Sequence, residues 1–289
     1  MQATMAAHGS GTRVSRSPVV DRLEAVSVAD VAAGAFPFRD LVVARTYDPR
    51  ADAAAMRAAQ ALADRMPGVV VIRGEDEALE PLARHAALMA VGCPERRRPA
   101  RLPGGDPSVF ARRLRVPVLV VPQAVGLDLT GVRSIVCGVR DCGDITTVVA
   151  CGALADALDL QLVLVHVWDE PVATAPAPLV LAAAPFDAAK PRNLASMREL
   201  LGDVARRAGR FGPGAACTRV IDGPVGDTLC RCGGDERAAL IAVTASRHGP
   251  FTSALRGSAA RYVTRHADRA VLVCPTHADP ALALGAHRR

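Results

Sequence analysis

The sequence predicts two doubly wound α/β domains, each built on a mostly parallel five-stranded sheet. Short β-branched apolar runs alternate with segments of helical periodicity, as expected for parallel strands joined by crossover helices. The phrase Pro-Val-Leu-Val-Val-Pro at 117–122 returns as Ala-Val-Leu-Val-Cys-Pro at 270–275, which indicates an internal repeat. The chain has 289 residues, of which 50% are apolar and 22% charged, so it is long enough for two hydrophobic cores.

The strands are expected in the same order in both halves of the chain. Upstream of each copy of the repeated phrase, the sequence contains two further apolar runs and, before them, a strand that is followed by a helix. In this interpretation the strand at 41–46 corresponds to 162–167, and the helix at 50–65 corresponds to one near 193–210. The remaining matched strands are 69–74 with 220–223, and 87–92 with 239–243.

A fifth strand, at 134–139, is clear only in the second half. The apolar residues after it, between 148 and 158, recur at the spacing of one helix face. The counterpart in the first half would lie near 13–20, where two arginines and a proline make a poor central strand. We therefore predict domains at 12–124 and 131–276, the first of them degenerate in this strand or lacking it.

The basic residues exclude several kinds of phosphate site. Lysine and arginine together number 35 against 29 acidic residues, yet Lys190 is the only lysine. A Walker A loop, a kinase strand lysine and a Schiff base each need a lysine in another setting, because Lys190 precedes a proline in a predicted loop. Any phosphate binding therefore depends on backbone amides and arginine. The densest arginine cluster, 96–101, offers nucleic-acid binding as a less favoured alternative, since aromatic residues are only 3% of the chain.

Cysteine usage and hydropathy favour a cytoplasmic protein with reduced thiols. The eight cysteines have no framework spacing, residues 1–17 have no signal-peptide core, and no apolar run reaches 18 residues, so no membrane contact is expected. Cys137 and Cys274 lie in apolar runs and are expected in the core. Cys230 and Cys232 lack the second pair of a zinc site, so no metal site is predicted, and a redox role for them is left open.

Residues 245–251 read Ala-Ser-Arg-His-Gly-Pro-Phe, Gly257-Ser258 precedes a predicted helix, and the strand Ala-Val-Leu-Val follows at 270–273. This pattern resembles the C-terminal part of the universal stress protein family, and the resemblance extends over nearly all of 131–276. It implies Rossmann-like domains of the adenine nucleotide alpha hydrolase-like type. Tandem pairs of such domains are a familiar form of that family, which agrees with the repeat.

Nucleotide-binding members of the family hold ATP with a G-x2-G-x9-G-[ST] loop and an aspartate after the first strand. In this chain Arg247 stands where the second glycine is expected, unless that glycine is deleted. Arg140 stands in the place of the aspartate, unless Asp141 serves with a shift of one residue. The resemblance implies an adenine-nucleotide site, with ATP as the expected cofactor, formed by Asp141, Val167, Ser246, Gly249, Gly257 and Ser258.

The first half carries no such site. Gly104-Gly105 stands where Gly-Ser would open the last helix, and the glycine loop is replaced by a Pro- and Arg-rich segment. In the second half, His166 and Trp168 end a strand and either line a ligand pocket or pack beneath the following loop. No catalytic residue is predicted, because neither His166 nor His248 has a readable Ser, Cys or Asp partner.

The resemblance implies a non-catalytic stress-response protein that acts by binding a protein partner, with an adenine nucleotide in the second half only. One alternative is an enzyme with weak ATP hydrolysis or nucleotidyl chemistry, which rests on fold analogy. The final strands, at 117–121 and 270–273, are predicted sheet edges, and unpaired edges tend to pair. We expect them to pair with each other into an intramolecular pseudo-dimer, and a homodimer of chains stays open.

Overall fold

The computed structural model describes residues 40–44, 48–66, 70–74, 86–94, 107–141, 144–168, 195–199, 201–202, 204–205, 216–245 and 259–275. Its strands are β1 (Asp40–Ala44), β2 (Val70–Gly74), β3 (Leu88–Cys93), β4 (Val118–Pro122), β5 (Ser134–Gly138), β6 (Gln161–Trp168), β7 (Cys217–Asp222), β8 (Ala238–Ala245) and β9 (Ala270–Pro275). Its helices are α3 (Pro49–Arg65), α5 (Pro107–Leu114), α6 (Ile145–Leu158), α8 (Val225–Asp235) and α10 (Ala259–His266), and residues 195–205 are helical where they are described.

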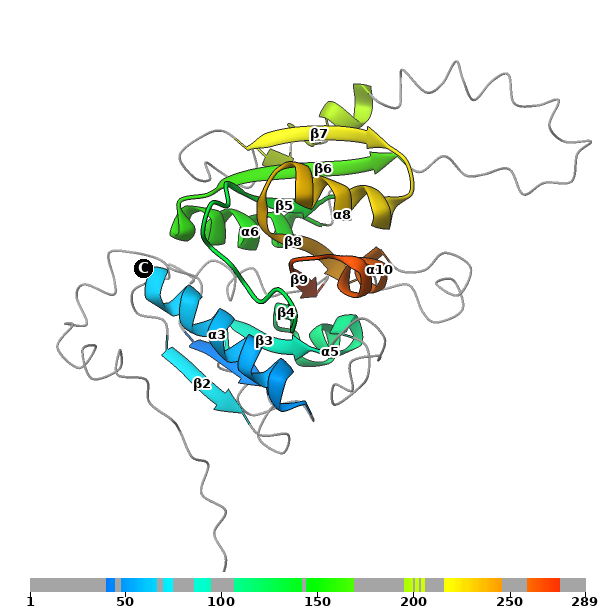
Figure 1. Cartoon of the computed structure of the whole chain (residues 1–289). Coiled ribbons are helices and arrows are strands. Elements are labelled where there is room, and N and C mark those ends of the chain that lie inside the picture. Colours follow the sequence, from blue (N-terminus) through cyan, green and yellow to red (C-terminus); the bar gives the residue numbers. More distant parts are fainter. Residues whose placement is uncertain are drawn as a thin grey trace, which may run out of the picture.

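The described strands form one sheet of nine, in the order β2-β1-β3-β4-β9-β8-β5-β6-β7. We call β1 to β4 the N-terminal half and β5 to β9 the C-terminal half. Within each half every strand pair is parallel, and the halves meet where β4 and β9 pair antiparallel, at the centre of Figure 1. Leu119 lies opposite Leu272 in this pairing. The predicted α/β fold and the predicted pairing of the two final strands are both confirmed.

The strand pairing corrects the predicted alignment of the repeat. β1 lies between β2 and β3, as β5 lies between β6 and β8. β1 therefore corresponds to β5, and not to the strand at 162–167 as the sequence suggested. The composition of a short apolar run does not show which strands lie beside it in the sheet, so the order of the runs alone could not decide between these alignments. The edge strand β7 has no counterpart among the described strands of the N-terminal half, and the segment near 13–20 lies outside the described residues.

α3 covers the N-terminal half at the place that α6 takes in the C-terminal half. Asp48 caps α3, since its carboxylate accepts hydrogen bonds from the backbone N–H groups of Arg50 (2.9 Å) and Ala51 (3.4 Å), and Pro49 fills the first helical position. Small side chains let the helix lie close to the sheet, because its buried face consists of Ala51, Ala54, Ala55, Ala58, Ala59, Leu62 and Ala63.

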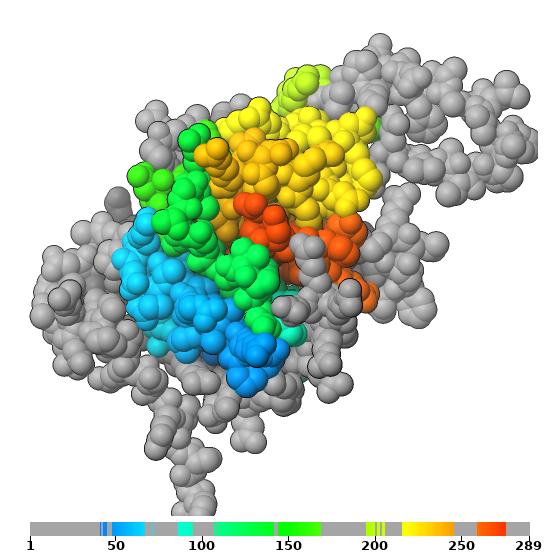
Figure 2. Space-filling model, viewed as in Figure 1, coloured from blue at the N-terminus to red at the C-terminus, as the bar shows by residue number. Residues whose placement is uncertain are grey.

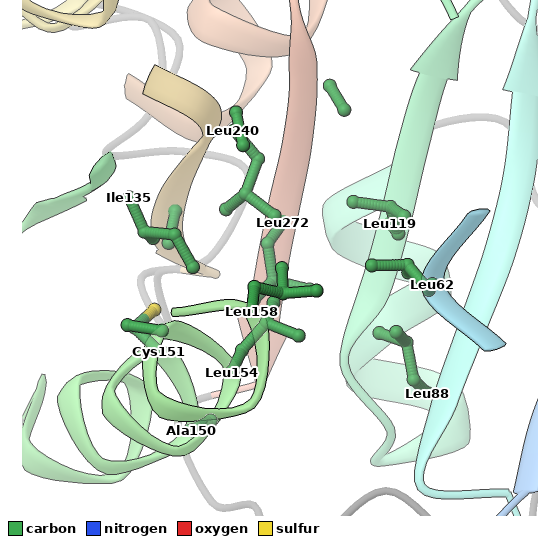
Figure 3. Close-up of a cluster of buried hydrophobic side chains, with 14 of the residues drawn as sticks. Leu62, Leu88, Leu119, Ile135, Ala150, Cys151, Leu154, Leu158, Leu240 and Leu272 are labelled. Carbon is green, nitrogen blue, oxygen red and sulfur yellow. The ribbon is translucent and has the colours of Figure 1, made fainter. Parts of the chain in front are cut away.

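Helices cover both faces of the sheet, and one core runs across the junction of the halves. α3 and α6 pack on one face, and α5, α8 and α10 pack on the other. Figure 3 shows Leu62, Leu88 and Leu119 of the N-terminal half facing Leu158 and Leu272 of the C-terminal half, all within a single buried cluster. In the space-filling view, α10 and β9, in orange to red, lie on the side of the C-terminal half that faces the N-terminal half (Figure 2). Within the described residues, no helix combines the length and apolarity of a membrane span.

Candidate functional site

The strand order places the candidate site at the carboxyl end of β5. The chain passes from β5 to β6 and β7 on one side, whereas β8 and β9 lie on the other. Open parallel sheets bind ligands at this kind of switch point, outside the carboxyl ends of the strands. The residues to consider are therefore those that follow β5, β6 and β8, together with the start of α6.

Arg140 and Asp144 form a compact ion pair just after β5. Oδ2 of Asp144 accepts hydrogen bonds from the backbone N–H of Arg140 (2.8 Å) and from its Nε (3.3 Å), and Oδ1 accepts one from Nη2 (2.9 Å). The side chain of Asp144 is 1% exposed, whereas that of Arg140 is 43% exposed. The hydrogen bond to Asp144 raises the pKa of Arg140 above its ordinary value, so the guanidinium stays charged.

Asp144 is also the residue that precedes α6, but its carboxylate makes no hydrogen bond to the helix amides. The first turn of α6 is joined to β8 instead. The hydroxyl groups of Thr147 and Thr244 lie 2.8 Å apart, and both residues are buried. This polar bridge fixes the start of α6 over the carboxyl end of β8.

The end of β6 is tied to the end of β5. Nδ1 of His166 lies 2.9 Å from the carbonyl oxygen of Val139 and donates to it, because a carbonyl can only accept. His166, Val167 and Trp168 are half-buried. The indole Nε1 of Trp168 is buried and has no hydrogen-bond partner within the described part of the chain.

Three buried thiols lie beneath this site. Cys137 on β5, Cys151 on α6 and Cys274 on β9 are all excluded from solvent. Figure 3 shows Cys151 within the buried cluster. Cys137 and Cys274 are therefore core residues, as predicted. A hydrogen bond with the Cys137 thiol, together with burial, raises the pKa of Cys151 well above its ordinary value. Burial likewise raises the pKa of Cys274. The thiols of Cys151 and Cys274 are therefore protonated and unreactive at neutral pH.

The structure describes two of the six predicted site residues. Asp141 is exposed and follows Arg140 directly, and Val167 lies on β6 opposite Ile221. The other four, Ser246, Gly249, Gly257 and Ser258, lie outside the described residues, as does the arginine cluster at 96–101. Among the residues described, no group of three or more His, Cys, Asp or Glu side chains is arranged to hold a metal ion.

Asp144, Thr147 and Thr244 are site residues that were not predicted from the sequence. The position of Asp144 indicated a structural role, because it stands four residues after Arg140 and directly before a helical pattern. That position fits an N-cap and an ion pair equally well, so sequence alone does not choose between them. Thr147 and Thr244 are 97 residues apart in sequence, and only the fold brings their hydroxyl groups together.

Comparison with known proteins follows the same division of the chain. The family model for the universal stress protein family matches residues 132–275. No curated protein matches the chain. Among solved structures, a functionally unknown protein from Pseudomonas aeruginosa PAO1 shares 16% sequence identity over 84% of each chain, with a TM-score of 0.47.

Two shorter solved structures are also similar to this chain. A universal stress protein in complex with cAMP shares 22% identity, covering 50% of this chain and 98% of its own, with a TM-score of 0.36. The universal stress protein from Archaeoglobus fulgidus in complex with dAMP shares 17% identity, covering 49% of this chain and 96% of its own, with a TM-score of 0.29. Through residues 132–275, which span its C-terminal half, the chain belongs to the universal stress protein family.

Proposed function

We propose that this protein is a non-catalytic regulator that binds an adenine nucleotide in its C-terminal half and acts on a protein partner. Family membership of residues 132–275 supports the ligand class. The observation that carries the proposal is the difference between the two switch points, one at the end of β1 and one at the end of β5.

In the N-terminal half the start of the helix is pressed directly onto the sheet. A Cβ atom placed on Gly92 of β3 would lie 2.0 Å from the carbonyl oxygen of Ala51 in the first turn of α3. Asp48 caps the same turn, so its backbone N–H groups are already bonded. Among the described residues, the backbone N–H groups of Arg50 and Ala51 at the start of α3 are therefore already occupied by Asp48.

In the C-terminal half the corresponding place carries polar side chains. Strand register makes Thr244 the counterpart of Gly92. Each of them pairs with a residue of the neighbouring strand, and that residue directly precedes the proline that ends the strand. Thr147 holds α6 to Thr244 through side chains, and Arg140 is fixed nearby. Three features favour an anionic ligand here. They are a cationic side chain, helix amides that Asp144 does not cap, and the position of the site at a switch point.

The chemistry of the described residues supports binding in preference to turnover. Nδ1 of His166 is bonded to a main-chain carbonyl, and the nearby thiols of Cys137, Cys151 and Cys274 are buried. A nucleophile needs an activating base within hydrogen-bond reach, and no such pair is formed among the described residues of this site. The role proposed for the nucleotide is therefore that of a bound signal.

Native mass spectrometry of the purified protein and calorimetric titration with AMP, ATP and cAMP test this proposal. Gly257→Val should abolish binding in the C-terminal half, because a side chain there blocks the approach of backbone amides to phosphate. Gly105→Val changes the corresponding glycine pair of the N-terminal half and is the matched control. We expect nucleotide binding by the wild type and by Gly105→Val, and none by Gly257→Val.

Absence of a copurified nucleotide, with no heat from any of the three ligands at millimolar concentration, would rule out the proposed ligand class. Release of phosphate from ATP above the rate of Gly257→Val would instead favour the enzyme. Capture of the protein's partner from a lysate should differ with and without the nucleotide that binds, and equal capture would contradict the regulatory role.

A further inference from the structure

Arg140 is held in place by one buried carboxylate. Its backbone N–H, Nε and Nη2 all donate to Asp144, whose side chain is excluded from solvent. A guanidinium that is already fixed loses little conformational freedom when it binds a ligand. Arg140 is therefore preorganised, although it remains partly exposed.

The N-terminal half shows the ordinary use of the same aspartate position. Asp48 and Asp144 both directly precede the helix that follows the first strand of their half, and Asp48 caps its helix. Asp144 bonds to Arg140 instead, which leaves α6 without a cap that contributes about 1 kcal/mol. The carboxylate thus fixes Arg140 at a cost to helix stability, and this use suggests a functional role for the arginine.

The guanidinium retains hydrogen-bonding capacity on its exposed side. An arginine side chain carries five N–H groups. Within the described residues, Arg140 uses only its Nε and one N–H of Nη2 for hydrogen bonds, both to Asp144. The two N–H groups of Nη1 and the second of Nη2 are thus available for a planar, paired contact with phosphate oxygens.

We infer that Arg140 is a ligand-binding residue whose guanidinium contacts a phosphate of the bound nucleotide. This inference rests on the proposed function and adds to it the group of the ligand that Arg140 recognises. Asp144 neutralises Arg140, and the exposed Asp141 adds a negative charge beside it. Recognition therefore comes from directed hydrogen bonds and not from a net positive field, and it should depend only weakly on salt.

The test compares adenosine with adenosine monophosphates that carry the phosphate on the 5′, 3′ or 2′ carbon. Affinities are measured by calorimetry for the wild type and for Arg140→Gln. Arg133→Gln is the matched control, because Arg133 is an exposed arginine at the opposite end of β5. Arg140→Gln removes the cation that neutralises the buried Asp144, so the double variant Arg140→Gln/Asp144→Asn, which keeps a neutral hydrogen-bonding pair, is measured beside it.

We expect the wild type to bind at least one monophosphate more tightly than adenosine. In both Arg140 variants that preference should fall by about tenfold or more, as expected for hydrogen bonds to a charged group. The affinity for adenosine should change by less than about twofold, and Arg133→Gln should resemble the wild type. The isomer that loses affinity identifies the phosphate that Arg140 contacts.

A structural role for Arg140 predicts a different pattern, in which adenosine and every monophosphate weaken by the same factor, or in which no affinity changes. Either result would overturn the inference while the proposed function stands. If no monophosphate binds the wild type, the inference fails, and if ATP and cAMP do not bind either, the proposed function is wrong as well.

Discussion

The two halves of the sheet differ most where the first helix meets the strand beside it. In the N-terminal half, Ala51 and Gly92 bring helix and strand into backbone contact. In the C-terminal half, Thr147 and Thr244 take the same two places and contact each other through their hydroxyl groups, which lie 2.8 Å apart. Two side-chain differences between the halves thus give one switch point where helix and strand are in backbone contact, and one where polar side chains lie between them.

The N-terminal half has a structural role. Its β4 covers the edge of β9 that would otherwise be unpaired, and its leucines complete the core around Leu272. The core positions also differ, because Val43 and Val121 of the N-terminal half correspond by register to Cys137 and Cys274. Buried thiol and hydroxyl groups therefore lie under the C-terminal switch point, where the N-terminal half has valine, alanine and glycine.

The largest effect is expected from Gly92→Ala, which tests whether the N-terminal half is sealed by backbone contact. The new Cβ would overlap the carbonyl of Ala51, and a backbone atom cannot move aside without shifting α3. Overpacking of this kind costs about 3 kcal/mol of the free energy of unfolding. Urea denaturation followed by circular dichroism measures the loss.

Gly234→Ala is the matched control in the C-terminal half. A Cβ at Gly234, inside α8, would meet no atom within 4 Å. Alanine should therefore stabilise the protein by about 0.5–1 kcal/mol. Equal free energies of unfolding for the two variants would show that Gly92 does not seal the helix to the sheet.

The next largest effect concerns the polar bridge of the C-terminal half. Thr147→Val leaves the buried hydroxyl of Thr244 without its partner, at a cost of about 2 kcal/mol, and Thr244→Val should cost a similar amount. The double variant removes both hydroxyl groups, as in the N-terminal half, and should lie within about 1 kcal/mol of the wild type. Additive losses in the double variant would mean that the two hydroxyl groups do not act as a pair.

The contrast between the halves also shows what the sequence could predict. Alternating apolar strands and helices were sufficient for the α/β fold, because buried parallel strands have a continuous apolar signature. The antiparallel pairing of β4 with β9 followed from their position as final strands. The equivalence of β1 with β5 did not, since it depends on which strands are neighbours, and register cannot be read from short valine-rich runs. At the site, Arg140 stood out as a departure from the family motif, whereas its partner Asp144 was missed, because its position fits a helix cap and an ion pair equally well.

The smallest effect concerns alkaline pH and the thiols that only the C-terminal half carries at these core positions. Burial raises the pKa of Cys274 in the folded protein, so its stabilising contribution is complete below the ordinary thiol pKa and is lost as the pH rises above it. The thiol of Cys274 should lower the free energy of unfolding by up to about 1.4 kcal/mol per pH unit above about 9.

Cys274→Val reproduces the residue found at Val121 and should reduce the loss between pH 9 and pH 10 by about 1 kcal/mol. Cys217→Val, at a half-buried thiol on the edge strand β7, is the control and should leave most of the loss in place. Urea titrations at the two pH values measure the difference. If Cys274→Val and the wild type lose the same free energy over this pH interval, the alkaline sensitivity does not arise from Cys274. The chemical difference between the two switch points would then be confined to Arg140, Asp144 and the threonine bridge.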